Sequence, residues 1–274
     1  MVQTTNNSTE NAKYTLSIQV SLNGFSFCIV NSNIEIIKLE RENFGIQLSP
    51  EQVLEKIKLA FDQNQNLKQN FSTIEVIYQN DLYSLVPKAL FDPEALGEYL
   101  KYTTKVLSTD FIVYDELNPY ELMNVYIPYT NINNFFFETF GAFTYKHTTS
   151  ILLEHILYKE KNNDIPVVYA HMSLKYFDLI VIDKGKLILS NSYPHETKED
   201  FLYYLLFVTE QLRLNPEEFK LFFLGDITKD SDYYAIAHTY IRTVAFGNRN
   251  NSITLSPEIQ PIEPHQHFTL LSHF

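Results

Sequence analysis

Seven residues near strand ends and turns have side chains or backbone freedom suited to binding a ligand. They are, in chain order, Ser21, Asn23, Gly24, Ser173, Lys175, Gly225 and Asp226. Their hydroxyl and amide groups can donate hydrogen bonds, and Lys175 can act as counter-charge to a phosphate. Asp226, or Asp178 on a neighbouring strand, can bind a sugar hydroxyl. The same residue types are ordinary solvated turn residues, so their chemistry depends on which elements bring them together.

The other reactive residue types match no familiar active site. His265 and His267 alternate and would share one face of a strand, but zinc needs further ligands, and none stands at a diagnostic spacing. The single cysteine, Cys28, excludes an internal disulfide framework, fits a reducing and therefore cytoplasmic compartment, and is expected to be buried and inert. The sequence also lacks a Gly-x-Ser-x-Gly elbow, a His-Glu-x-x-His motif, a Walker loop and a Rossmann glycine pattern. We therefore expect no catalytic residue and no metal site.

Length and charge narrow the class of protein. The 274 residues suit two domains of ordinary size, and 45% hydrophobic residues are enough for two cores. The net charge of −12, without a dense cluster of lysine and arginine, argues against binding to nucleic acid or anionic membranes. No stretch approaches the ~20 apolar residues of a membrane helix. Residues 1–12 are polar, lack the features of a signal peptide, and are predicted to be a disordered tail.

The stretch Pro166–Asp226 predicts three strands, a helix and a fourth strand. Two apolar runs of strand length, rich in β-branched and aromatic residues, precede a tight turn at Lys184-Gly185. Thr197 opens the helix, with Asp200 placed to complete a capping box. The near-continuous apolar run Phe219–Leu224 is typical of a central strand covered on both faces.

The same order of elements is predicted once before. Tyr14–Val30 and Ile34–Leu39 give three strands, Ser49-Pro50 opens a helix, and Phe71–Tyr78 is the next strand. Ser21 aligns with Ser173, and Ser49 with Thr197, at similar spacings. We interpret this as an internal duplication of a βββαβ unit.

The remaining elements complete two lobes, predicted to span residues 13–147 and 148–274. Further helices are expected from Asp92-Pro93 through Thr103, from Asn131 through Phe140, over Thr148–Tyr158, and from Ser231 through Val244. Further strands are expected over Tyr83–Pro87, Phe111–Tyr114, Asn124–Tyr129, Phe143–Lys146, Ser252–Leu255 and His267–Leu271.

This duplicated βββαβαβ plan, with a hairpin at the start of each half, resembles the actin-like ATPase superfamily, and most of all its pilus-assembly and cell-division branch. The whole chain, including SLVP at Ser84–Pro87 and the C-terminal PHQHFTLLSHF, resembles a family of Bacteroidetes proteins, the domain of unknown function 3822. The resemblance implies an α/β fold of two RNase H-like lobes around a cleft. It implies no established activity.

In active members of that superfamily, each hairpin turn carries an Asp-x-Gly type sequence that cradles phosphates and holds Mg²⁺. Here the first turn, Ser21-Leu22-Asn23-Gly24, has no aspartate, and the second, Ser173-Leu174-Lys175-Tyr176, has neither aspartate nor glycine. Only one glycine of the adenosine motif remains, at Gly225. These departures predict that ATP hydrolysis is lost and that the seven residues form a vestigial cleft.

The sequence therefore predicts a non-enzymatic scaffold with a degenerate nucleotide site, an unidentified protein partner and no cofactor. The alternative is a divergent nucleotide-binding ATPase or kinase that keeps ATP and Mg²⁺ at a modified phosphate site. An RNase H-type nuclease is disfavoured, because Leu16–Ser21 and Val168–Ser173 contain no carboxylate.

Overall fold

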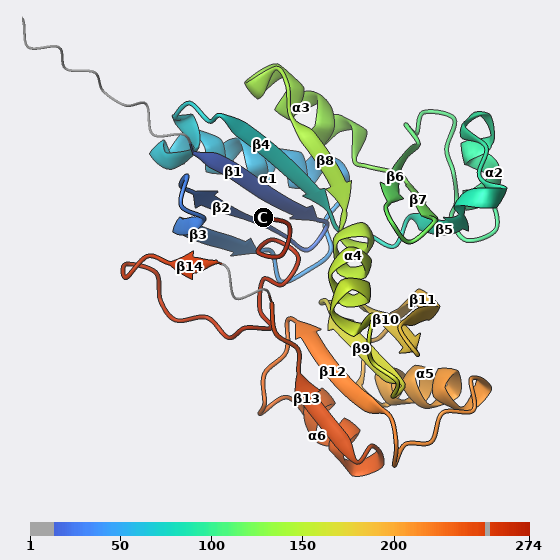
Figure 1. Ribbon diagram of the computed structural model, residues 1–274. Helices are drawn as coiled ribbons and strands as arrows, with labels where there is room; N and C mark the ends of the chain where they lie inside the picture. Colours follow the sequence, from blue (N-terminus) through green and yellow to red (C-terminus); the bar gives the residue numbers. More distant parts are fainter. Residues whose placement is uncertain (1–13, 250–252) are drawn as a thin grey trace, which may run out of the picture.

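The computed structural model describes residues 14–249 and 253–274, and the predicted tail at 1–12 lies outside them. The first lobe is built on a six-stranded sheet (Figure 1). Its strands, in spatial order, are β14 (Thr254–Leu255), β3 (Glu35–Asn43), β2 (Gly24–Val30), β1 (Thr15–Ser21), β4 (Thr73–Tyr78) and β8 (Thr144–His147). The predicted strand at 143–146 is thus present as β8.

The second lobe is built on a five-stranded sheet. Its strands, in spatial order, are β11 (Lys186–Pro194), β10 (Tyr176–Asp183), β9 (Val167–Met172), β12 (Lys220–Gly225) and β13 (Thr243–Phe246). In both sheets the central strand pairs antiparallel with the second strand of the unit and parallel with the fourth. This common order supports the internal duplication, which stays a prediction, as do the residue boundaries of the two lobes.

The helices that Ser49, Thr197 and Ser231 cap begin as predicted, whereas the predicted cap Asn131 lies inside its helix. Helix α1 (Pro50–Gln63) starts with a capping box between Ser49 and Gln52, and α5 (Lys198–Gln211) with one between Thr197 and Asp200. Helix α3 (Thr130–Phe140) packs beside α1, and α6 (Asp232–Tyr240) beside α5. No helix within the described ranges, 14–249 and 253–274, is long and apolar enough to cross a membrane.

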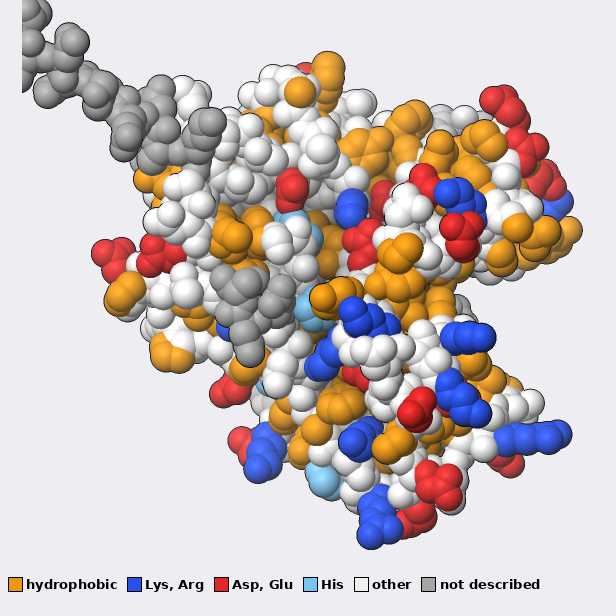
Figure 2. All heavy atoms as spheres, in the orientation of Figure 1, with side chains coloured by type: hydrophobic (Ala, Val, Ile, Leu, Met, Phe, Trp, Pro, Cys, Tyr) orange, Lys and Arg blue, Asp and Glu red, His pale blue; other side chains and the backbone are white. Residues whose placement is uncertain are grey.

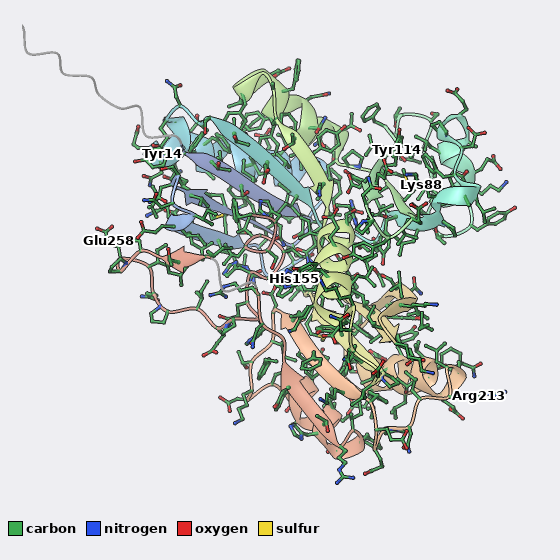
Figure 3. The ribbon with its side chains drawn as sticks, viewed as in Figure 1. Tyr14, Lys88, Tyr114, His155, Arg213 and Glu258 are labelled. Atoms are coloured by element: carbon green, nitrogen blue, oxygen red, sulfur yellow. The ribbon has the colours of Figure 1, made fainter. Side chains whose placement is uncertain are left out.

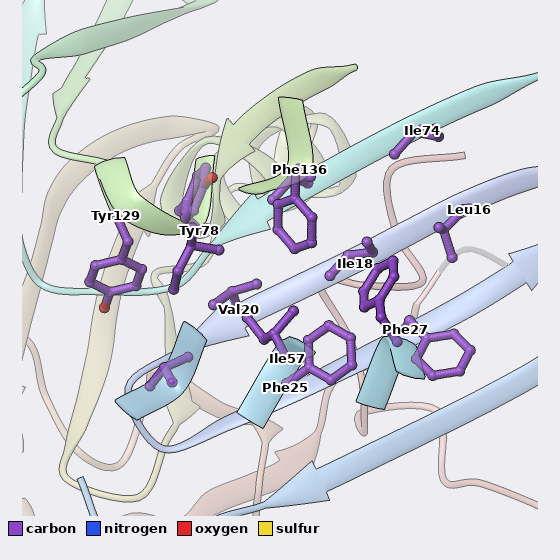
Figure 4. Close-up of a cluster of buried hydrophobic side chains, with 14 of the residues drawn as sticks. Leu16, Ile18, Val20, Phe25, Phe27, Ile57, Ile74, Tyr78, Tyr129 and Phe136 are labelled. Atoms are coloured by element: carbon purple, nitrogen blue, oxygen red, sulfur yellow. The ribbon is translucent and has the colours of Figure 1, made fainter. Parts of the chain in front are cut away.

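The core of the first lobe lies between its sheet and helices α1 and α3 (Figure 4). Leu16, Ile18 and Val20 alternate along β1, face this core and are fully buried. Ile57 of α1 and Phe136 of α3 meet them from the other side. Each such side chain contributes about 1.5–3 kcal/mol by leaving water.

A small third sheet interrupts the first lobe. It has the order β5 (Tyr83–Pro87), β7 (Leu122–Tyr126), β6 (Val113–Leu117) and carries α2 (Leu96–Leu100); Lys88 and Tyr114 mark it in Figure 3. The helix predicted through Thr103 ends earlier, at Leu100, and turns follow it. The β-branched side chains of Thr103 and Thr104 have a low propensity for helix. The two predicted strands are shifted, and β7 stops before Pro128, which cannot donate to a ladder.

Two predictions near the C-terminus are wrong. The helix predicted through Val244 ends at Tyr240, and the β-branched pair Thr243-Val244 instead lies in β13, paired with β12. The predicted strand His267–Leu271 consists of turns, and the Leu271 amide bonds to the His267 carbonyl at 3.0 Å. A strand cannot bury both Leu270 and Leu271 on one face, whereas a turn can.

The space between the lobes is filled by α4 (Thr148–Glu160) and by residues 264–274, which we call the C-terminal segment (Figure 1). His155 of α4 contacts Phe268 of this segment, with ring centroids 4.9 Å apart (Figure 3). Phe268 packs against the second sheet, while Leu270 and Leu271 pack against Cys28 and other residues of the first. The C-terminal segment therefore joins the two lobes through apolar contacts, although the sequence placed it wholly in the second.

Candidate functional site

The lobes enclose a cavity of about 480 Å³. Six of the seven predicted site residues line it, namely Ser21, Asn23, Gly24, Ser173, Gly225 and Asp226. Lys175 does not, because its side chain is exposed at the hairpin turn while its neighbours Leu174 and Tyr176 face the cavity. The structure thus brings the two turns and the end of β12 together around the cavity, but Lys175, the proposed counter-charge to a phosphate, lies outside it.

The first turn satisfies its own polar groups. The Ser21 hydroxyl accepts a hydrogen bond from the Asn23 amide at 3.2 Å and donates one to the Gly24 carbonyl at 3.1 Å. Gly24 is required for space, because a Cβ atom there would lie 2.8 Å from the Glu42 carbonyl oxygen on β3. The glycine therefore serves the packing of β3 against the hairpin.

The second turn is bound from both sides. The Ser173 amide donates to the Tyr176 carbonyl at 3.0 Å, and the Ser173 hydroxyl accepts from the Gln79 amide of the first lobe at 2.6 Å. His195 Nε2 donates to the Ser173 carbonyl at 2.9 Å, so its Nδ1 accepts from the Tyr233 hydroxyl at 3.0 Å. Burial lowers the pKa of His195, which favours this neutral form.

Gly225 closes the third wall of the cavity. Its φ of +81° and its contact with β9 both require glycine, since a Cβ atom would lie 2.5 Å from the Met172 carbonyl oxygen. The Gly225 amide donates to the His265 carbonyl at 2.9 Å, and the Asp226 amide donates to the Met172 carbonyl at 2.9 Å. Both amides are therefore already used within the protein.

Asp226 is the only carboxylate among the described residues that line the cavity, and it is paired with Arg41 of β3 in the opposite lobe. Both carboxylate oxygens accept from the guanidinium, which raises the pKa of Arg41. Burial, followed by repulsion from Arg41, lowers the pKa of the neighbouring His267 to about 4. The lining of the cavity thus presents hydroxyl, amide and neutral imidazole groups to a ligand, and Arg41 neutralises the charge of Asp226.

A hydrogen-bond chain crosses the cleft beside this pair. Thr269 of the C-terminal segment donates to Gln19 at 2.8 Å, Gln19 donates to Gln79 at 2.6 Å, and Gln79 donates to Ser173. The chain connects the C-terminal segment, the first lobe and the second lobe. Sequence reasoning missed Arg41, Gln19 and Gln79, because single polar residues in strands carry no motif that marks them as facing a cleft.

The histidines do not assemble a metal site. His265 Nε2 donates to the Ile227 carbonyl at 2.7 Å, and its ring stacks on Phe246. His267 has a positive φ of 49° and lines the cavity apart from His265. Over residues 14–249 and 253–274, no group of three or more histidine, cysteine, aspartate or glutamate side chains lies close enough to hold a metal ion.

Comparison with solved structures identifies the architecture. A Bacteroides thetaiotaomicron protein with actin-like ATPase fold and unknown function matches with a TM-score of 0.77 and 21% identity, over 88% of this chain and 93% of that one. The PilM–PilN type IV pilus biogenesis complex matches with a TM-score of 0.62 and 12% identity, over 94% of this chain and 96% of that one. These similarities confirm the predicted two-lobed, actin-like ATPase fold.

Sequence comparison gives the family. Among curated proteins, no significant match is found. The model of the family described as "Protein of unknown function (DUF3822)" matches residues 3–244, most of the chain, as the resemblance in the sequence implied. The chain therefore belongs to the DUF3822 family and has the actin-like ATPase fold.

Proposed function

We propose that the protein is a non-enzymatic protein-interaction scaffold whose nucleotide site is degenerate. The observation that carries this proposal is the pairing of Asp226 with Arg41 across the cleft. Hydrolysis of a nucleotide needs Mg²⁺ bound through carboxylates and phosphates. The cavity has one lining carboxylate within the described part of the chain, and an arginine neutralises it.

The backbone supports the same proposal. A phosphate in an actin-like cleft is held by amide groups of the turns. Here the amides of Ser173, Gly225 and Asp226 already donate to carbonyls of the protein itself. Binding a phosphate at these amides would require breaking those bonds, which costs about 1 kcal/mol or more for each bond.

The protein-interaction role takes its support from the architecture. The PilM structure is a complex with PilN, so a chain of this fold serves there as a partner of another protein. We extend that role, without the identity of the partner, to this chain. We also propose a cytoplasmic location, which the free and buried Cys28 supports.

The alternative, a divergent nucleotide-binding ATPase or kinase, has one observation in its favour. The cavity volume of about 480 Å³ falls in the range of small-molecule sites, and six predicted site residues line it. In this alternative a ligand would displace Asp226 from Arg41 and use both groups.

Titration calorimetry with ATP and ADP, with and without Mg²⁺, separates the two functions. We expect no heat of binding and no rise in melting temperature at millimolar nucleotide. A ligand at about 100 times its Kd would stabilise the protein by about 2.7 kcal/mol, so true binding would be detected. Saturable micromolar binding that is lost in Thr228→Trp, which blocks the cavity from an exposed wall position, would overturn the scaffold proposal.

A further inference from the structure

The longest unpaired sheet edge in the described chain belongs to β11. This strand has nine residues, pairs with β10 on one side, and has no partner strand on the other among residues 14–249 and 253–274. The remaining edge strands of the three sheets have two to five residues. An edge of this length presents a row of backbone donors and acceptors to which another strand can pair.

The interior of β11 does little to block such pairing, although Lys186 begins the strand, Pro194 ends it and a bulge lies at Ile188. Between Lys186 and Pro194 it reads LILSNSY, without any charged residue. Proteins usually protect long edges with inward charges, prolines within the strand or a covering element. In the first lobe, β14 covers the equivalent strand β3 at Glu35 and Ile36, with which it pairs in parallel. The β11 edge has no such cover from the described residues.

An aromatic surface leads from this edge onto α5, which lies beside β11 (Figure 1). Tyr193 of β11 stacks on Tyr204 with ring centroids 4.9 Å apart, Tyr204 contacts Tyr203 at 5.3 Å, and Tyr203 stacks on Phe207 at 6.0 Å. Tyr203 is 61% exposed and Phe207 48% exposed. We call Tyr193, Tyr203, Tyr204 and Phe207 the aromatic ladder. Exposed aromatic rings of this kind are typical anchors of interfaces.

Figure 2 shows cationic and anionic side chains interspersed over the second lobe, but the exposed charged residues within α5 are both glutamates, which favours a cationic partner. Glu199 lies one helical turn before Tyr203, and Glu210 lies one turn after Phe207; both are exposed. The nearby Lys198 is paired with Asp232 at 3.5 Å. The chain as a whole has a net charge of −12. Lysine or arginine side chains can pair with these glutamates and lie over the tyrosine rings.

We propose that the β11 edge and the aromatic ladder form a docking surface for an extended, lysine- and arginine-rich segment of a partner protein. The segment adds a strand to β11 through backbone hydrogen bonds, and its basic side chains reach the aromatic ladder and the flanking glutamates. This inference deepens the interaction role proposed above and rests on it. It does not depend on the state of the interlobe cavity.

A display library of random ten-residue peptides, selected on the purified full-length protein, tests the proposal. We expect enriched peptides to combine basic with β-branched residues and to slow hydrogen exchange of the β11 amides. Replacing both exposed rings, Tyr203→Ser and Phe207→Ser, should weaken binding at least about tenfold, as loss of interface anchors commonly does. The matched control is Phe137→Ser on α3, a ring 65% exposed in the other lobe, which should leave binding unchanged.

The other outcomes overturn the docking surface. They are the absence of enriched peptides, equal binding by the double variant, or unchanged exchange in β11. Self-association of the wild-type chain that disappears in Ile188→Lys, a charge at an exposed position of β11, would assign the edge to a second copy instead. Peptide binding at β11 together with micromolar nucleotide binding would refute the scaffold proposal and leave the docking surface standing.

Discussion

The guanidinium of Arg41, on β3 of the first lobe, binds both carboxylate oxygens of Asp226, which follows β12 in the second lobe. The two residues are 185 positions apart in the chain. Their pairing closes one side of the interlobe cavity, while the C-terminal segment closes another. Two kinds of contact therefore hold the cleft closed. The Arg41–Asp226 pair is polar and can break, whereas the apolar contacts of the C-terminal segment belong to the hydrophobic core.

The Arg41–Asp226 pair should contribute little to stability but measurably to cleft closure. Both side chains are about 40% exposed, so water and salt screen the attraction. We expect a coupling free energy of about 0.5–1 kcal/mol in a double-mutant cycle of Arg41→Ala and Asp226→Asn, measured by urea unfolding. It should shrink at 1 M salt, and hydrogen exchange around Gly225 should quicken. A coupling no larger than that of an exposed helix pair such as Lys58–Glu55 would contradict the closure role.

Gly225→Ala should destabilise the protein by about 2–3 kcal/mol. The substitution adds a Cβ 2.5 Å from the Met172 carbonyl oxygen and leaves alanine at a φ of +81°. Gly97→Ala in α2 is the matched control, because a Cβ atom at this position would contact only the Ile112 side chain, at 3.8 Å. We expect the stability of this variant to be unchanged or to rise by up to about 1 kcal/mol. Urea unfolding of the two variants measures both; equal stability would show that β9 and β12 can move apart freely.

Leu271→Ala should cost about 2–5 kcal/mol, as for a core leucine, although it lies in a segment without a helix or strand. Its side chain is fully buried together with Leu270, Cys28 and Ile151. Phe274→Ala, in the same segment but only partly buried, should cost clearly less. Thermal unfolding compares the two variants; similar small losses would mean that the C-terminal segment is only loosely attached.

Stability should fall as the pH drops from about 6.5 towards 4, partly because of His147. Its Nδ1 accepts the Thr149 amide at the start of α4, so a proton on this nitrogen would oppose an N–H group. Burial lowers the pKa of His147 to about 4. Between pH 6.5 and pH 4, His147 is therefore protonated in the unfolded chain but not in the folded one. This difference lowers the free energy of unfolding by up to about 3 kcal/mol at pH 4.

The comparison of unfolding free energies at several pH values checks the role of His147. His147→Asn keeps an oxygen that can cap α4 but cannot titrate. We expect this variant to be less stable at pH 7.5 and to lose less stability on acidification than the wild-type chain. The same slope in both proteins would place the acid sensitivity on other groups, such as His267, whose pKa is also lowered to about 4.

Local sequence signals predicted the two hairpins and the capped helices, because Ser49 and Thr197 with their capping partners determine helix starts by themselves. They also located Ser21, Ser173 and Gly225 at strand ends that meet. What could not be predicted depends on distant contacts. The role of Arg41 depends on Asp226, which lies opposite it only in the folded protein. The C-terminal segment turns because Phe268 is buried in one hydrophobic cluster while Leu270 and Leu271 are buried in another.

The return of the C-terminal segment also sets the order in which the molecule can be completed during synthesis. The partners Ser17–His273, Gln19–Thr269 and Cys28–Leu270 are 242 to 256 residues apart. At ~5–20 residues per second, the ribosome needs roughly 10–50 s to make the 250 residues between Gln19 and Thr269. The lobe that is translated first therefore lacks the contacts of Leu270 and Leu271 with its sheet until residues 264–274 have been made.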